Sequence, residues 1–390
     1  MRIPGFTSTG SKRPEALFGA GAPLGLPVRL TRASGSTAWD SEGRSYLDFI
    51  MALGAVALGY GHPEVNRAAH AAIDAGVVGP LPPEAEERLA ERLAGVMPWM
   101  ERTRFLKTGA EAVMAAVRLA RAATRREAVL RCGYHGWLDW CQPPGTPGVP
   151  AATFALAQEL PFNDCERARA VIRLMGDRLA AVVLEPIVER EPTPEWLTTL
   201  RDETRRVGAL LVLDEIKTGF RIALGGAAER YGLEPDLVVL GKALANGFPL
   251  AAVGGRRDVM EEARHTWISS TLATEMVALA AAQATIDVMV REHVPEQLHA
   301  LGTRLLDGLR QLESRHPAVV REAAGVPELC FLRFNSETLG ALVARVAAGR
   351  GLLWKRSAYN FVSLAHTPEA VDRGLELLDA ACAEVGRTAV

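Results

Sequence analysis

Several short apolar runs in this sequence end at residues that could do chemistry. The groups that follow these runs are Thr108-Gly109, Tyr134-His135, Glu185, Asp214 and Lys242. Apolar runs that alternate with helical stretches indicate a mostly parallel sheet with helices on both faces. Ligands bind beyond the carboxyl ends of the strands in such sheets, so we expect these groups to converge on one site and to contact its ligand.

Lys242 and Asp214 have the chemistry to hold an aromatic aldehyde cofactor. Lys242 follows an apolar run and Gly241, so burial should lower the pKa of its amine and favour a Schiff base. A carboxylate such as Asp214 keeps a pyridine nitrogen protonated through a charge-assisted hydrogen bond. These are the needs of pyridoxal 5′-phosphate (PLP), whose protonated ring acts as an electron sink. The same amine can move the proton between the substrate and the cofactor.

The remaining parts of a PLP site can also be assigned. Thr108-Gly109-Ala110-Glu111 opens a predicted helix, and a helix N-terminus binds phosphate. Tyr134 could stack on one face of the cofactor ring and Ile216 could pack on the other. The alternative for Tyr134 and Trp137 is a place in the core as ordinary aromatics. No metal ligand is assigned.

The polar assignments have structural alternatives. Thr108 and Glu111 could simply form a capping box, and Asp214 could be a helix cap or a surface turn residue. Lysine is usually solvated, but Lys242 lies in Leu237–Gly255, which holds no other charged residue. A PLP-fold protein without catalysis, serving as a scaffold or sensor, would not require both Lys242 and Asp214.

The elements that must position these groups follow from the apolar pattern. Helices are expected at Glu84–Val96 and from Glu111 to about Arg125. Strands are expected at Ser36–Asp40, Arg44–Phe49, Thr103–Leu106, Ala128–Leu130, Leu179–Leu184, Ala209–Leu213, Leu237–Leu240, Leu329–Phe334 and Phe361–Leu364. We therefore predict an α/β protein, with an N-terminal arm and part of a small domain at 1–54, a large cofactor-binding domain at 55–290, and the rest of the small domain at 291–390.

The composition argues against several other classes of protein. The 390 residues carry a net charge of −2 without a block of like charge, which disfavours a nucleic-acid or membrane partner. The five cysteines form no C-x-x-C pair, so a reducing cytoplasm fits best. Neither a secretory signal nor a membrane-spanning stretch is expected. A glycine fingerprint after a strand is missing, which disfavours an NAD-dependent dehydrogenase.

The motifs together resemble those of the class III aminotransferases, a PLP fold-type I group that includes the ω-aminotransferases and glutamate-1-semialdehyde aminomutase. The resemblance covers roughly residues 28 to 385 and is carried by Phe105–Ala112, Gly133–Gly136, Leu213–Arg221, Gly241–Pro249 and Ser269–Thr271. It implies a large, mostly parallel sheet domain with a smaller α+β domain, and small-molecule amine or amino acid and keto substrates. It also implies a homodimer with shared active sites, in which Thr271 reaches the phosphate of the neighbouring subunit.

Departures from the family pattern bear on the reaction. The aminomutase typically has an Asn-Ser-Pro-Val-Arg stretch, whose arginine helps to bind the substrate carboxylate. The arm Gly19–Pro27 has no such arginine, and Arg29 is predicted to belong to the first strand. Glu185-Pro186 is followed by Ile187–Pro192 instead of a glycine-containing loop. We therefore predict an aminotransferase that works through a Lys242 Schiff base, with an intramolecular aminomutase as the alternative.

Overall fold

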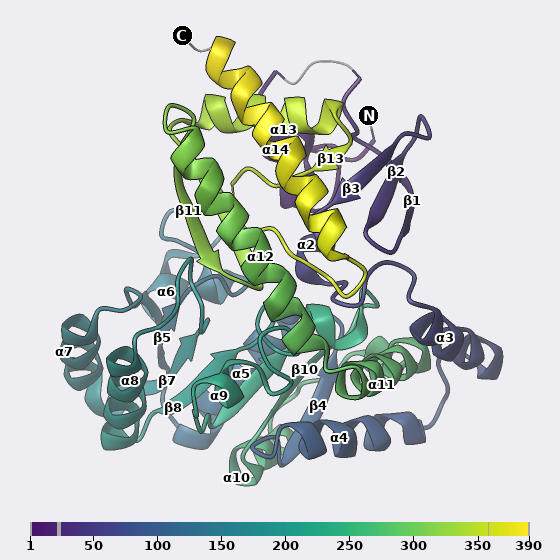
Figure 1. Cartoon of the computed structure of the whole chain (residues 1–390). Helices are drawn as coiled ribbons and strands as arrows, with labels where there is room; N and C mark the ends of the chain where they lie inside the picture. The colour runs from purple at the N-terminus through teal and green to yellow at the C-terminus, as the bar shows by residue number, and fades with distance from the viewer. Residues whose placement is uncertain (1, 22–24, 358, 389–390) are drawn as a thin grey trace. The chain divides into compact units, whose positions relative to one another are not determined.

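The computed structural model describes residues 2–21, 25–357 and 359–388. Its contacts divide the chain into two compact units (Figure 1). Glu64–Glu292 form the central unit, and Met1–Pro63 with His293–Val390 form the terminal unit. The predicted arm Gly19–Pro27 lies partly outside the described residues, which omit 22–24.

A seven-stranded, mostly parallel sheet forms the centre of the central unit (Figure 1). Its strand order is β4-β10-β9-β8-β7-β5-β6, and only β10 runs antiparallel to its neighbours. The strands are β4 (Arg102–Leu106), β5 (Ala128–Cys132), β6 (Ala157–Glu159), β7 (Leu179–Leu184), β8 (Leu210–Asp214), β9 (Leu237–Leu240) and β10 (Ala251–Gly255). The α/β fold predicted from the sequence is therefore confirmed.

The sheet is held by strands that are apolar on both faces. Every residue of β7, β8, β9 and β10 is buried. Alternate residues of the strands pack against the long helix α5 (Gly109–Thr124). This cluster includes Val113, Ala116, Val117 and Ala120 of α5 with Val183, Val212 and Val239 of the strands. Burial of one valine contributes roughly 1.5–3 kcal/mol, so the cluster fixes α5 firmly against the sheet.

The other helices of the central unit pack around this sheet. They are α3 (Pro63–Ala75), α4 (Glu84–Val96), α6 (Ala151–Phe154), α7 (Cys165–Met175), α8 (Pro194–Val207), α9 (Gly226–Arg230), α10 (Arg257–Met260) and α11 (Met276–Arg291). α8 packs against β7 and β8, α7 packs on α8, and α4 packs on α11. Among the described residues, no helix combines the length and the apolar character that a membrane crossing needs.

The strand directions bring the predicted site residues to one edge of the sheet. β4 is antiparallel to β10, which is antiparallel to β9, so β4 runs in the same direction as the parallel strands. The carboxyl ends of β4, β5, β7, β8 and β9 therefore point the same way. Asp214 is the last residue of β8, and the turns that carry Thr108, His135, Glu185 and Lys242 follow the other ends.

The described residues of the terminal unit form two small sheets and five α-helices. β1 (Leu30–Ser34), β2 (Thr37–Asp40) and β3 (Ser45–Asp48) pair antiparallel in sequence order, and β13 (Leu352–Leu353) runs parallel to β3. β11 (Val320–Val326) and β12 (Leu329–Phe334) form an antiparallel pair. The helices are α1 (Pro14–Phe18), α2 (Met51–Gly54), α12 (Val294–Arg315), α13 (Glu337–Gly349) and α14 (Pro368–Thr388).

Phe361–Leu364 does not form the strand that its apolar run predicts. The N–H of Phe361 donates to Phe49 O at 2.7 Å, and the N–H of Leu364 donates to Ala57 O at 2.8 Å. These acceptors belong to two separate stretches of backbone, whereas a ladder needs one continuous partner. The run is apolar because it is enclosed by the core of the terminal unit.

Arg29 lies before the first strand and not within it. β1 begins at Leu30, which is the first residue to pair with β2. Arg29 is exposed, and its guanidinium carbon lies 3.8 Å from the centroid of the Phe6 ring. The strand thus begins one residue later than predicted, although the carbonyl of Arg29 still accepts the N–H of Ser41, which follows β2, at 3.1 Å. The segment before β1 consequently ends in Pro27-Val28-Arg29, the last three residue types of the Asn-Ser-Pro-Val-Arg stretch.

Candidate active site

Asp214 and His135 form a buried hydrogen-bonded pair. His135 Nδ1 lies 2.8 Å from Asp214 Oδ2, with the two side chains 0% and 3% exposed. Because a carboxylate can only accept, we assign the proton of His135 to Nδ1. Asp214 Oδ1 accepts the N–H of Ile216 at 3.2 Å, and the His135 ring stacks on Trp140 at 5.9 Å between centroids. Asp214 is therefore neither a helix cap nor a surface turn residue.

Lys242 begins a short 3-10 turn directly after β9 and Gly241. Its φ of 42° lies in the left-handed region, which a residue other than glycine adopts only where its surroundings enforce it. The residue is half-buried. Its amine makes no hydrogen bond or ion pair with any residue in the described ranges. It is therefore available to a ligand.

Charges of both signs act on the Lys242 amine. Burial has the largest effect and lowers the pKa of Lys242. The carboxylates of Asp214 and Glu185 raise this pKa, and the cations of Lys217 and Arg221 lower it. A lower pKa increases the fraction of neutral amine near pH 7, and only the neutral amine attacks a carbonyl carbon or accepts a proton.

The N-terminus of α5 is capped and still open to an anion. Thr108 Oγ1 accepts the N–H of Glu111 at 3.3 Å, and Glu111 Oε2 accepts the N–H of Thr108 at 2.8 Å, so the capping box exists. The N–H groups of Gly109 and Ala110 make no hydrogen bond within the part of the chain that the structure describes. They can donate to a phosphate, as first-turn N–H groups commonly do. The cap and a phosphate site are thus compatible.

Ile216 fills the space between this helix end and the turn after β9. A Cβ at Gly109 would lie 2.5 Å from Ile216 Cδ1, and a Cβ at Gly241 would lie 3.5 Å from Ile216 Cγ1. Only glycine at position 109 permits the closer of these two approaches. Ile216 therefore lies between the predicted phosphate site and Lys242, where it can pack against a bound ring.

Glu185 joins the ends of three neighbouring strands. Its Oε1 lies 2.6 Å from Nζ of Lys217, which follows β8. Its Oε2 accepts the N–H of Tyr134, which follows β5, at 3.1 Å. Lys217 Nζ also donates to Ile187 O at 3.2 Å. A Cβ at Gly133 would lie 2.5 Å from Glu185 Cβ, so the turn after β5 closes over Glu185 only because it starts with glycine.

The aromatic residues of the turn after β5 are exposed. Tyr134 and Trp137 are 72% and 73% exposed, which excludes the alternative that they are core aromatics. A Cβ at Gly136 would lie 2.7 Å from the Cβ of Ala110, so this turn lies against the N-terminus of α5. The Tyr134 ring is thus available to a ligand near the predicted phosphate site.

Thr271 is not joined to the other predicted site residues. It begins the short 3-10 helix η6 (Thr271–Thr274) and is exposed. No hydrogen bond or ion pair within the described ranges links it to the groups above. The nearby Glu275 is tied to Lys107, with Nζ and Oε1 2.6 Å apart. The role predicted for Thr271 involves a second subunit and stays a prediction.

Three charged residues of the same motif, of which Glu215 and Arg221 are buried and Lys217 is partly buried, were given no role by sequence reasoning. Lys217 pairs with Glu185, and Arg221 is 0% exposed. Glu215 accepts the N–H groups of Ala227 and Ala228 at 2.9 Å each, and burial raises the pKa of Glu215 to about 7. Three charges in a stretch that also forms a core strand could have identified these residues in the sequence, because buried charges need partners.

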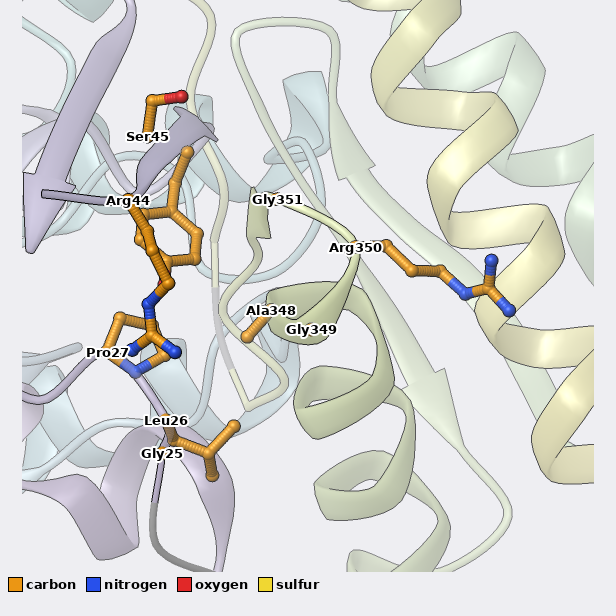
Figure 2. A pocket seen from close by; sticks show the side chains of 10 residues that line it. Gly25, Leu26, Pro27, Arg44, Ser45, Ala348, Gly349, Arg350 and Gly351 are labelled. Carbon is orange, nitrogen blue, oxygen red and sulfur yellow. The ribbon is translucent and has the colours of Figure 1, made fainter. Parts of the chain in front are cut away.

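A cavity of about 200 Å³ lies in the terminal unit, away from these groups in the sequence (Figure 2). It is lined by Gly25, Leu26, Pro27, Arg44, Ser45, Tyr46, Ala348, Gly349, Arg350 and Gly351. Arg44 is paired with Asp40 at 2.7 Å, and Arg350 is paired with Glu384 at 2.6 Å. Figure 2 shows the Arg350 side chain extending away from the other lining side chains. Both cations are already compensated, so we assign no ligand to this cavity.

The groups gathered in the central unit fit PLP. The amine of Lys242 is unengaged within the described residues, as an aldehyde requires. Each oxygen of Asp214 has one protein partner and retains a lone pair for a ring nitrogen. The open N–H groups of Gly109 and Ala110 suit the phosphate. Aldehyde, ring nitrogen and phosphate are thus each matched by a group of the required chemistry.

Comparison with known proteins agrees with this fit. The family described as Aminotransferase class-III matches residues 21–381. A glutamate-1-semialdehyde 2,1-aminomutase of Thermomicrobium roseum is 36% identical over 395 residues, which cover 93% of this chain and 92% of that protein. The FumI protein of Sphingopyxis sp., in its PLP internal aldimine form, has a TM-score of 0.92 at 29% identity, with 99% of this chain and 94% of that chain covered. An omega-transaminase from Sphaerobacter thermophilus has a TM-score of 0.88 at 25% identity, with 98% and 95% covered.

The family match spans most of the chain, and the fold, the sequence and the PLP-bound neighbours all indicate the same family and cofactor. The chain belongs to the class III aminotransferases and is a PLP-dependent enzyme of fold type I.

Proposed function

We propose that the protein is an aminotransferase that moves an amino group from an amine or amino acid donor to a keto acid or aldehyde acceptor. The observation that carries this proposal is the unengaged Lys242 amine in the same unit as the buried Asp214–His135 pair. When bound, PLP supplies an electron sink for the electrons released at the substrate Cα. Lys242 holds the cofactor through its amine and afterwards carries the proton between the substrate Cα and the C4′ carbon.

The other site residues position the cofactor and stabilise the charge on its ring. Asp214 holds the proton on the ring nitrogen, and His135 fixes the orientation of the carboxylate through the 2.8 Å bond to Oδ2. The N–H groups of Gly109 and Ala110 bind the phosphate at the start of α5. Ile216, which packs close to Gly109, supports one face of the ring.

An aminomutase of the glutamate-1-semialdehyde type is the second candidate, and two observations favour it. Relatives that are 36% and 35% identical, from Thermomicrobium roseum and Thermus thermophilus, carry that name. Arg29 also lies before β1, as the arginine of the Asn-Ser-Pro-Val-Arg stretch would. In this reaction the same residues act, but the amino group stays on one carbon skeleton.

Product analysis distinguishes the two candidates. For an aminotransferase we expect a ¹⁵N-labelled donor to pass its label to a separate keto acid or aldehyde, with the donor recovered as its carbonyl product. A panel of donors and acceptors, followed by mass spectrometry, measures this. An isomer of the labelled substrate, formed without net transfer to any acceptor, would replace the aminotransferase by the aminomutase.

Lys242→Ala should remove turnover and keep some affinity for the cofactor. The nucleophile and the proton carrier are lost together, so we expect kcat to fall by several orders of magnitude, on the scale of about 10³-fold or more. Borohydride should attach the cofactor to a single tryptic peptide of the wild-type protein, the one that contains Lys242. Lys12→Ala, at an exposed lysine, is the control with unchanged labelling and rate. Label on Lys107, Lys217 or Lys355 would contradict the assignment.

Asp214→Asn should separate catalysis from cofactor binding. Asparagine keeps the shape but not the charge that holds the ring proton, so we expect kcat to fall by about a hundredfold or more. Cofactor occupancy should change far less, because the phosphate and lysine contacts remain. Asp236→Asn makes the same substitution just before β9, where Asp236 accepts the N–H of Leu211 at 2.8 Å, and should leave kcat unchanged. A near-normal kcat for Asp214→Asn would remove Asp214 from the mechanism.

We also propose that the active form is a homodimer in which Thr271 reaches the phosphate bound by the partner. Large apolar side chains near Thr271 support this, since Trp267 is 81% and Leu272 is 54% exposed. Clustered exposed apolar groups are typical of interaction surfaces. A two-fold interface would place both copies of this segment symmetrically.

Mixing two impaired variants tests that arrangement. Lys242→Ala and Thr271→Ala subunits, denatured together at equal amounts and refolded, should form about half heterodimers, each with one site of normal composition. Activity should then return to about a quarter of the wild-type value, although the Lys242→Ala protein alone is inactive. If Thr271 served its own subunit, mixing would restore nothing.

A further inference from the structure

Lys217 and Glu185 form an ion pair in the same group of turns as Lys242. Nζ and Oε1 are 2.6 Å apart, and the side chains are only 12% and 8% exposed. Burial of two charges is costly, and the cost is recovered only if the remaining hydrogen-bonding capacity is used. Here it is used, because Lys217 also donates to Ile187 O and Glu185 also accepts the N–H of Tyr134.

The pair ties together the turns that carry the other groups of the site. Glu185 follows β7, Lys217 follows β8, and Tyr134 follows β5, and these strands are neighbours in the order β8-β7-β5. One turn carries His135 beside Tyr134, and Lys217 lies in the turn that directly follows Asp214, the last residue of β8. The pair therefore braces both partners of the buried hydrogen bond.

The pair also acts on Lys242 with opposing charges. Among the charged side chains that act on this amine, Asp214 and Glu185 favour its protonated form, while Lys217 and Arg221 oppose it. Lys217 thus offsets the charge of Glu185 as felt at Lys242. Removal of Lys217 or Glu185 alone leaves the charge of the other uncompensated at the Lys242 amine.

We propose that Lys217 and Glu185 are a charge-compensating pair of positioning residues that sets the protonation state of the linkage between Lys242 and the cofactor. This inference rests on the proposed role of Lys242 as the cofactor anchor. The pair acts through the electric field at Lys242 and through the segments that carry His135 and Asp214. We assign it no contact with the reacting carbon.

The two partners make predictions of opposite sign. Loss of a cation in Lys217→Met should raise the pH at which the linkage in the holoenzyme loses its proton, by about one unit or more. Loss of an anion in Glu185→Gln should lower it by a similar amount. In the double variant both charges are absent, so its midpoint should return to within a few tenths of a unit of the wild-type value. The measurement is the change in visible absorbance of the bound cofactor during a pH titration without substrate.

A matched ion pair at the other end of the strands is the control. Arg256 and Asp236 are also 2.6 Å apart, and Asp236 directly precedes β9, whereas Lys242 follows it. At roughly 3.3 Å per residue they lie on the order of 15–20 Å from Lys242, well beyond the screening length of about 10 Å. Arg256→Met and Asp236→Asn should therefore leave the midpoint unchanged.

The outcomes separate this inference from the proposed function. If the wild-type protein binds PLP at another lysine, the proposed function fails before any variant is compared. If wild-type labelling is at Lys242 but the single variants shift the midpoint in the same direction, or not at all, the inference alone is overturned. Lys217→Arg keeps the positive charge, and it provides a second test if the Lys217→Met protein does not fold. It should retain a near-normal midpoint, and a shift as large as that expected for the lost charge would also overturn the inference.

Discussion

The hydrogen bond between His135 and Asp214 is the interaction on which the rest of the site depends. Burial of an ionised carboxylate is costly unless it is hydrogen-bonded, and Asp214 is only 2% exposed. His135 supplies the partner at 2.8 Å and is itself held by Trp140. The pair thus links the ends of β5 and β8, and the remaining groups are arranged around a negative charge that the fold can sustain.

Much of this arrangement could be predicted from local pattern. The strands at 179–184 and 237–240 and the helix at 84–96 have the bounds expected from their apolar runs and periodicity. Burial along the whole strand makes such runs continuous, and that signal is strong. Phe361–Leu364 has the same composition, but two separate acceptors hold its backbone, so no ladder forms. An apolar run indicates burial, and it indicates pairing only when a continuous partner exists.

The contacts that could not be predicted are those set by register between strands. Leu184 pairs with Leu213, and this pairing brings the turn after β7 beside the turn after β8. The bond between Glu185 and Lys217 follows from it, although the two residues are far apart in the sequence. Thr108 shows a different limit: its pattern fits a cap and a phosphate site equally well, and the structure allows both because they use different N–H groups.

The position of β10 has a consequence for the order in which the site is assembled. β4, which leads into the α5 N-terminus, is bonded only to β10, and β10 is the last strand of this sheet to leave the ribosome. Until Ala251–Gly255 is present, no strand pairing joins β4 to β9 and the turn of Lys242, although α5 can already pack on β9. A nascent chain that stops before this strand can align the groups at the ends of β5, β7, β8 and β9, but it lacks the strand that pairs β4, and with it the α5 N-terminus, to that edge. Capture of the cofactor should therefore be a late event in biosynthesis, one that follows closure of the sheet.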